Sequence, residues 1–246
     1  MRALGLDGRG RLLDVGCGPG IVALRLAHLF DEVVGVDIDP DMLTEAGRRA
    51  PEQGVTRARW INARAEQLPR DLGPFRVATF GRSFHWMDHE RLVPRVFELL
   101  NPGGAFVVLL ETSEASPAPD APLPHPAPPR AAVEALLQRY LPRSEREAGR
   151  ERRAEMLRDV VPMLARAGFS GPEHVRADGN DPLVRSIDDV VAFYFSHSHS
   201  APPLFAGRAA EFEAELRRLL AEASPPGLFS ERTRDVLASI WRKPRP

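Results

Sequence analysis

Residues 11–20 read Arg-Leu-Leu-Asp-Val-Gly-Cys-Gly-Pro-Gly, and this stretch decides the fold. Its apolar residues Leu12, Leu13 and Val15 predict a short strand, and the three glycines that follow at a spacing of two predict a tight turn. The apolar spacing over residues 21–29 then predicts a helix. A glycine turn between a strand and a helix lets a ligand lie against bare backbone, and the free N–H groups of the helix start favour an anionic group.

A carboxylate one strand further along is the second feature of a nucleoside site. The apolar run 33–36 ends in Asp37, and a carboxylate at the tip of the second strand accepts hydrogen bonds from ribose hydroxyls. The dinucleotide fingerprint G-x-G-x-x-G would need glycine at position 21, where this chain has Ile21. The spacing therefore disfavours a nicotinamide-dependent oxidoreductase, which stays the alternative within enzymes.

The string Asp-Val-Gly-Cys-Gly-Pro-Gly over residues 14–20 resembles motif I of the class I S-adenosylmethionine-dependent methyltransferases. Asp37 is similar to the family's ribose-binding acid. Residues 64–69 (Arg-Ala-Glu-Gln-Leu-Pro) resemble its adenine-bordering segment, and residues 100–104 (Leu-Asn-Pro-Gly-Gly) resemble its opening of strand 5. The resemblance covers roughly residues 11–110. It implies S-adenosyl-L-methionine as cofactor and assigns to the cofactor site Asp14, Gly16, Cys17, Gly18, Gly20, Asp37, Ile38, Met42, Ala65, Glu66, Gly81 and Phe84.

The sequence departs from the family pattern in three places, one of which is the fourth strand, where the usual Phe-Asp opening is Phe75-Arg76. The family's acidic contact with adenine is missing because position 64 is Arg64, so only backbone or Glu66 would replace it. Family members also carry one or two helices before the first strand, whereas the first strand expected here begins at residue 11. Either further sequence lies upstream, or inserted helices cover the pocket.

Strand and helix patterns alternate up to residue 110, which predicts right-handed crossovers and a parallel sheet covered on both faces. Together with the resemblance, this gives an α/β fold: a doubly wound, mostly parallel seven-stranded sheet with an antiparallel last strand, plus helical lid insertions. The segment Phe229–Trp241 is expected to be that last strand. We expect residues 1–112, 153–180 and 230–246 to form the Rossmann-like core, and residues 113–152 and 181–229 to form the insertions.

The insertions interrupt the core twice, before and after the sixth strand. Residues 115–129 hold seven prolines and predict an extended connector; helices are expected near 130–141 and 144–167, and a helical pair over 186–224. We expect Phe193, Tyr194 or Phe195, with some part of 130–160, to form the wall of an acceptor pocket opposite Trp86.

Residues 81–88 read Gly-Arg-Ser-Phe-His-Trp-Met-Asp and are the predicted reaction centre. The Phe-His-Trp string resembles methyltransferases that act on small molecules. His85 is the candidate base for a hydroxyl acceptor, although it would equally fit simple packing. Asp88 is predicted to cap the next helix. The expected substrate residues are His85, Trp86, Phe193, Tyr194 and His197; for His197 and His199 a lid contact is favoured over a metal site, and no metal is expected.

The overall composition limits the classes of partner that are expected. The net charge is −1 and no apolar run reaches eighteen residues, so neither a nucleic acid nor a membrane is expected as a partner. A single cysteine, Cys17, and a start without a signal-peptide core favour a cytoplasmic protein. The predicted function is methyl transfer to the oxygen, or to a carbon or nitrogen, of a small-molecule acceptor. A cofactor-binding protein without turnover and a homodimeric state are left open.

Overall fold

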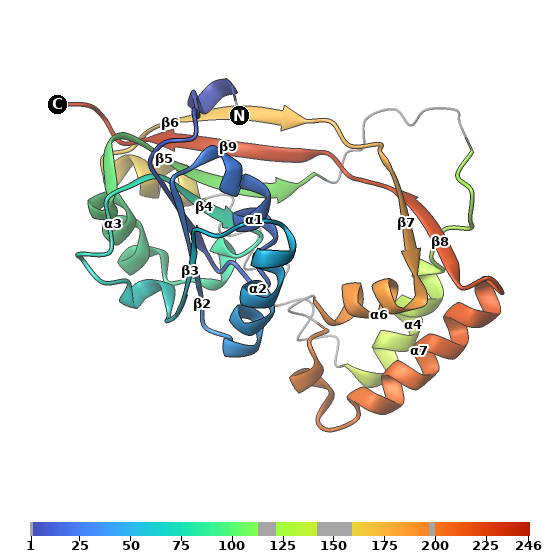
Figure 1. The fold of residues 1–246 in the computed structure, drawn as a ribbon. Helices are drawn as coiled ribbons and strands as arrows, with labels where there is room; N and C mark the ends of the chain where they lie inside the picture. Colours follow the sequence, from blue (N-terminus) through green and yellow to red (C-terminus); the bar gives the residue numbers. More distant parts are fainter. Residues whose placement is uncertain (1, 113–121, 142–158, 197–199) are drawn as a thin grey trace. The chain divides into compact units, whose positions relative to one another are not determined.

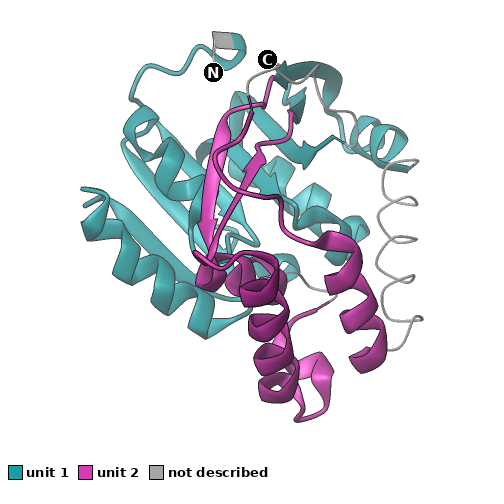
Figure 2. Ribbon diagram, turned by 90° about the vertical axis from the view of Figure 1, so that its right-hand side faces the viewer, with its two compact units in different colours: residues 1–112, 155–177, 236–246 teal, residues 113–154, 178–235 magenta. Residues whose placement is uncertain are grey.

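The computed structural model describes residues 2–112, 122–141, 159–196 and 200–246 (Figure 1). The chain divides into two compact units, shown in different colours in Figure 2. Unit 1 comprises residues 1–112, 155–177 and 236–246, and unit 2 comprises residues 113–154 and 178–235. His197, His199, part of the proline-rich connector and much of the helix expected over 144–167 lie outside the described residues.

A seven-stranded sheet forms the centre of unit 1. Its order is β3-β2-β1-β4-β5-β9-β6, and β9 runs antiparallel to both of its neighbours while the remaining pairs are parallel. The bounds are β1 (Arg11–Val15), β2 (Glu32–Asp37), β3 (Ala58–Asn62), β4 (Phe75–Gly81), β5 (Leu100–Glu111), β6 (Ser170–Ala177) and β9 (Val236–Arg242). This confirms the predicted fold class. The strand order reverses at β1 and β4, and ligands of such sheets bind outside the carboxyl ends of the strands at this point.

Helices follow the strands of unit 1 as the sequence predicts. They are α1 (Ile21–Leu26), α2 (Pro40–Glu52) and α3 (His89–Leu99), with single turns η1 (Arg2–Leu4), η2 (Ala27–Leu29), η3 (Ala65–Gln67) and η4 (Phe84–Trp86). The Asp88 side chain accepts a hydrogen bond from Arg91 N and caps α3, which confirms that expectation. Strands β1, β2 and β4 are buried at nearly every position, as a parallel sheet covered on both faces requires.

Unit 2 has a helical core of its own. Its elements are α4 (Arg130–Tyr140), β7 (Pro182–Ser186), α6 (Ile187–Phe195), η5 (Pro202–Phe205), α7 (Ala209–Ala223) and β8 (Leu228–Arg232). Val133, Leu136, Val191, Phe212 and Phe229 are among the apolar side chains buried together. Ser186 caps α6 by accepting a hydrogen bond from Asp189 N. The helical pair predicted over 186–224 is therefore confirmed.

The expectation that Phe229–Trp241 forms a single last strand is wrong. Its first part is β8, which pairs with β7 in a separate two-stranded sheet, and only Val236–Arg242 joins the large sheet as β9. Side chains between the two strands fix the break: Thr233 Oγ1 accepts a hydrogen bond from Asp181 N at 3.1 Å, and the buried Asp235 accepts one from Gly179 N at 2.7 Å.

Candidate functional site

The glycine turn between β1 and α1 presents bare backbone at one point. Gly16, Gly18 and Gly20 have φ angles of +65°, +52° and +77°, a range that residues other than glycine rarely adopt. A Cβ placed on Gly16 would lie 2.5 Å from the Cβ of Ser83, and one on Gly20 would lie 2.9 Å from the ring of Trp60. A Cβ on Gly18 would meet no heavy atom within 4 Å. Gly16 and Gly20 thus meet neighbouring side chains, while Gly18 faces open space.

Asp37 lies directly against this turn, at the end of β2. Its Oδ2 accepts a hydrogen bond from Gly18 N at 2.7 Å, and its Oδ1 accepts one from Asp39 N at 3.0 Å. The turn is also tied to β2 through the carbonyl of Val36, which accepts from Gly16 N at 2.8 Å and from Cys17 N at 3.0 Å. The structure therefore brings together the two features of the nucleoside site that the sequence indicated.

Asn62 supports this arrangement and was missed by the sequence reasoning. Its Nδ2 donates to the carbonyl oxygens of Asp37 at 3.1 Å and Ile38 at 2.8 Å, which fixes the backbone on which the carboxylate stands. The only sequence signal was a polar residue at the end of the third strand, where the carboxyl ends of parallel strands meet.

Asp14 lies beneath the turn, away from the surface. Its Oδ2 accepts from Ala23 N at 3.1 Å and its Oδ1 accepts from Thr79 Oγ1 at 2.8 Å, so it joins α1 to β1 and β4. Burial raises the pKa of the Asp14 carboxyl to about 6, against the hydrogen bonds from Thr79 and Ala23 that lower it. Asp14 thus positions the turn from below, and its assignment to the cofactor site remains a prediction.

Cys17 is buried within the turn. Burial raises the pKa of its thiol well above the usual range, with Asp14 and Asp37 as lesser causes. A thiol of this kind stays protonated at neutral pH and is a poor nucleophile. Cys17 is therefore better explained as a small residue that the turn accommodates than as a nucleophile.

Three exposed apolar side chains follow the carboxyl ends of β1 and β2. Ile21, Ile38 and Met42 are exposed by 58%, 60% and 37%. Ile38 directly follows Asp37, Met42 lies in the first turn of α2, and Ile21 begins α1 after the glycines. The carboxyl ends of the strands are where ligands of such sheets bind. Ile38 and Met42 were predicted for this site, whereas Ile21 had been noted only as the residue that replaces a glycine.

Glu66 is engaged with the neighbouring helix. Its Oε1 accepts from Asp88 N at 2.9 Å, and Arg64 Nε lies 3.6 Å from its Oε2. The carboxylate thereby holds η3, which contains the half-buried Ala65, to the start of α3. That Glu66 or Ala65 borders adenine remains a prediction.

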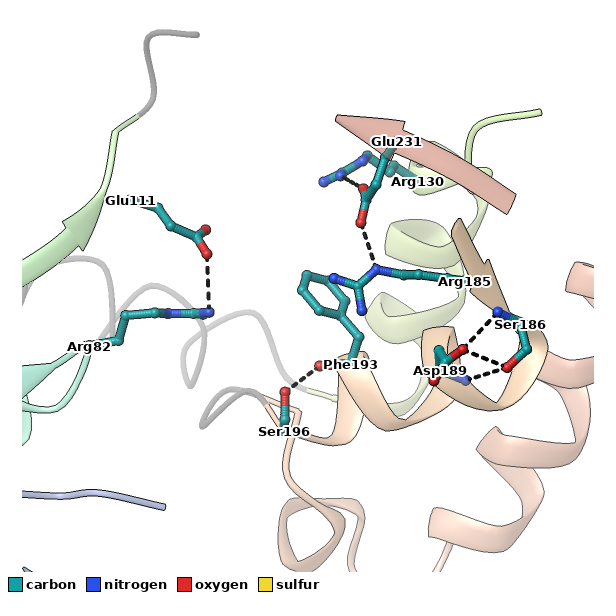
Figure 3. A network of polar contacts seen from close by, with 9 residues as sticks. All are labelled: Arg82, Glu111, Arg130, Arg185, Ser186, Asp189, Phe193, Ser196 and Glu231. Atoms are coloured by element: carbon teal, nitrogen blue, oxygen red, sulfur yellow. Dashed lines mark hydrogen bonds and ion pairs between the residues drawn. The ribbon is translucent and has the colours of Figure 1, made fainter. Parts of the chain in front are cut away.

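The segment after β4 lies beside the glycine turn. Ser83 Oγ donates to the carbonyl of Val15 at 2.6 Å, and a Cβ on Gly16 would lie 3.0 Å from Met87 Cε. A Cβ on Gly81 would lie 2.9 Å from Val22 Cγ2, so glycine lets α1 approach β4. The next residue, Arg82, has a φ of +59°, and its Nη1 lies 3.7 Å from Glu111 Oε1 (Figure 3).

Within this segment the aromatic residues divide between core and surface. Phe84 is buried against Phe106, with ring centroids 5.4 Å apart, and His89 Nε2 donates to its carbonyl at 2.7 Å. Phe84 therefore supports the turn from the core. His85 is half-buried and Trp86 is exposed, with their rings 5.2 Å apart. The role of His89 in fixing this turn had no sequence signal.

The remaining predicted residues belong to unit 2 or are not described. Phe193 and Tyr194 belong to α6 of unit 2, and His197 is outside the described residues. In the part of the chain that the structure describes, no group of three or more His, Cys, Asp or Glu side chains is arranged to hold a metal ion. Nor does any helix in that part have the length and apolarity needed to cross a membrane.

Comparison with known proteins agrees with this geometry. Residues 12–104 match the methyltransferase domain family. Over 110 residues the chain is 33% identical to trans-aconitate 2-methyltransferase of Variovorax paradoxus, covering 44% of this chain and 40% of that protein. It is 37% identical over 102 residues to demethylmenaquinone methyltransferase of Thermus thermophilus, covering 40% of this chain and 46% of that protein. The chain thus matches less than half the length of these curated relatives.

The whole chain also resembles a solved structure. A Bacillus halodurans protein assigned as a methyltransferase aligns with a TM-score of 0.54 at 19% identity, covering 99% of this chain and 96% of that one. At this identity the likeness concerns the fold alone. Residues 12–104 are thus similar to a methyltransferase domain, and the chain has the Rossmann-like fold of that solved structure.

Proposed function

We propose that this protein transfers a methyl group from S-adenosyl-L-methionine to a small-molecule acceptor. The observation that supports this most directly is the open space at Gly18 beside the Asp37 carboxylate. Two relatives named for methylation of small molecules, trans-aconitate and demethylmenaquinone, support the acceptor class.

The residues present fit this cofactor. Asp37 would hold the ribose hydroxyls, and the backbone at Gly18 would lie against the amino acid end. Ile38 and Met42 offer exposed apolar surface for the adenine. S-adenosylmethionine, when bound, supplies a methyl group on a positively charged sulfur, whose bond to carbon breaks as an acceptor lone pair attacks and leaves S-adenosylhomocysteine.

The chain's own residues contribute alignment, exclusion of water and proton removal. Trp86 offers an aromatic face, which attracts a cation and keeps water away. His85 would take the proton of a hydroxyl acceptor as its oxygen forms the new bond. A carboxylate acceptor carries no proton to remove and needs no base. Alignment supplies the rest, because displacement at a methyl group requires little other assistance.

Calorimetry and a turnover assay test this proposal. The full chain should bind S-adenosylmethionine more tightly than NAD, and should form S-adenosylhomocysteine with at least one member of a panel of carboxylates, phenols and alcohols. Tighter binding of NAD would overturn the cofactor assignment. Binding without turnover across the panel would instead support a cofactor-binding protein.

A further inference from the structure

Unit 2 contains a small hollow beside α4, α6 and the β7–β8 pair. Its lining includes the polar residues Arg130, Arg185, Tyr194 and Glu231 and the apolar residues Val190 and Phe193. None of these polar residues is used by the nucleoside site of unit 1, and only Tyr194 and Phe193 were singled out from the sequence.

A single carboxylate in the hollow is shared by two guanidinium groups. Arg185 Nε donates to Glu231 Oε1 at 2.8 Å, and Arg130 donates to the other oxygen, Oε2 (Figure 3). The side chains of Arg185 and Glu231 are only 23% and 15% exposed, so their charges are weakly screened. Glu134 also acts on Tyr194 electrostatically but does not line the hollow. The lining therefore carries two positive charges and one negative charge.

Hydrogen-bond donors also exceed acceptors in this lining. The Arg185 guanidinium lies over the Phe193 ring, 4.7 Å from its centroid, which holds its plane in place (Figure 3). Among the described residues, no hydrogen bond uses the two terminal nitrogens of Arg185 or the hydroxyl of Tyr194. Burial raises the pKa of Tyr194, so its hydroxyl keeps its proton and can donate. Such a set of donors is suited to a ligand group that only accepts hydrogen bonds.

We propose that this hollow binds an organic carboxylate. A planar carboxylate matches the paired terminal N–H groups of a guanidinium held in a fixed plane. Tyr194 adds a donor, and Phe193 and Val190 provide apolar contact for the carbon skeleton attached to the carboxylate. The ligand class is thus an organic acid with an apolar portion.

Titration of the full chain with benzoate, followed by NMR, tests the site without any turnover. Benzyl alcohol, which has the same ring and no charge, is the matched ligand. Benzoate should give saturable shifts at Arg185 and Tyr194 and bind at least about tenfold more tightly than benzyl alcohol, as charge-assisted hydrogen bonds predict. Equal binding of the two ligands, or no saturable binding of benzoate, would overturn the inference.

Three variants sharpen the test. Arg185→Gln should weaken benzoate binding about tenfold, and Tyr194→Phe, which removes one hydroxyl and keeps the packing, about two- to fivefold. Arg139→Gln is the control, because Arg139 lies on α4 but pairs with Glu215 and does not line the hollow. An equal loss of benzoate affinity in Arg139→Gln would contradict the assignment of the site. If Arg185→Gln does not fold, the benzoate affinity of Tyr194→Phe tests the site instead.

Turnover separates this inference from the proposed function. If benzoate binds as described while no acceptor yields S-adenosylhomocysteine, the proposed function fails and the anion site stands. If alcohols are methylated while no carboxylic acid is bound or methylated, the anion site fails and the proposed function stands.

Discussion

Asp37 and Gly18 are joined by a single 2.7 Å hydrogen bond, and each can be changed separately. Asp37→Ala should weaken S-adenosylmethionine binding by about 1.5–3 kcal/mol, the loss of charge-assisted hydrogen bonds to the ribose. Calorimetry gives the affinity, and Asp41→Asn is the control because Asp41 is an exposed acid on the first turn of α2. Wild-type affinity in Asp37→Ala would exclude this residue from the site.

Gly18 tests the steric part of the same proposal. Gly18→Val should abolish S-adenosylmethionine binding, because the side chain would fill the open space beside the turn. Gly54 is a matched control: its φ is +70°, close to the +52° of Gly18, and a Cβ there would also meet nothing within 4 Å. Both valines should lose about 1–2 kcal/mol of stability from backbone strain. Comparable binding by the two variants would show that the Gly18 space is not used.

His85 is the third residue with a measurable role. With a hydroxyl acceptor, His85→Ala should lower turnover by roughly 10²–10⁴ while leaving cofactor affinity nearly unchanged, because only proton removal is lost. The decrease in the turnover rate of the wild type at acid pH should also be absent from His85→Ala. His28→Ala, an exposed histidine on η2, should leave both quantities unchanged. A loss below tenfold in His85→Ala would leave His85 as a packing residue.

Several contacts at the site could not be predicted from the sequence. Glu66 bonds to a residue 22 positions away and Ser83 to one 68 positions away. Each pairing depends on how crossovers place one strand end beside another, which local composition does not encode. Motif residues such as Gly18 and Asp37 were predictable because their spacing within one βαβ unit is short and fixed by geometry.

At the scale of elements, the strands of the parallel sheet were predictable and the last strands were not. Buried parallel strands are continuous apolar runs, and 33–36 is one. The segment containing β8 and β9 has a polar run over 230–235 between two apolar stretches, and composition alone does not tell an exposed part of one strand from a break between two strands. The break depends on hydrogen bonds to Gly179 and Asp181, far away in sequence.

The junction of β1, β4 and α1 makes stability depend on pH through Asp14. Its pKa is about 6 in the folded state, above the ordinary value of 3.8, so this carboxyl stabilises the fold fully below pH 3.8. That contribution is lost as pH rises through about 6, and amounts to about 3 kcal/mol at 1.36 kcal/mol per pKa unit. Asp14→Asn keeps an acceptor for Ala23 N and cannot titrate.

Urea unfolding at several pH values measures this effect. The stability of the wild type relative to Asp14→Asn should fall by about 2–2.5 kcal/mol between pH 4 and pH 7, which is most of the full effect. Asp39→Asn, a change at the exposed cap of α2, controls for loss of a carboxylate in the same unit. A constant difference between wild type and Asp14→Asn across this range would contradict the assignment of the titration to Asp14.

At the scale of the whole molecule, the chain combines a Rossmann-like unit, whose residues 12–104 match a methyltransferase domain, with a second unit that has its own core. The aromatic stripe on α6 divides between two roles within that unit. Phe195 packs against Phe205 and Phe212, with centroids 5.8 Å apart in each pair, whereas Phe193 and Tyr194 line the hollow. The sequence could place the stripe on one helix but could not say which rings were core, because that depends on α7.

That unit 2 closes over the acceptor remains a prediction, and hydrogen exchange tests it on the full chain. A site that transfers a methyl group must exclude water, and closing elements do this. With S-adenosylhomocysteine and an acceptor both bound, amides of 187–195 and 130–140 should gain protection beyond that given by either ligand alone. Amides of β6, at the edge of the sheet away from β1, are the internal reference. Protection confined to the residues around the glycine turn would show that unit 2 takes no part in closure, and its aromatic residues would then be explained by packing alone.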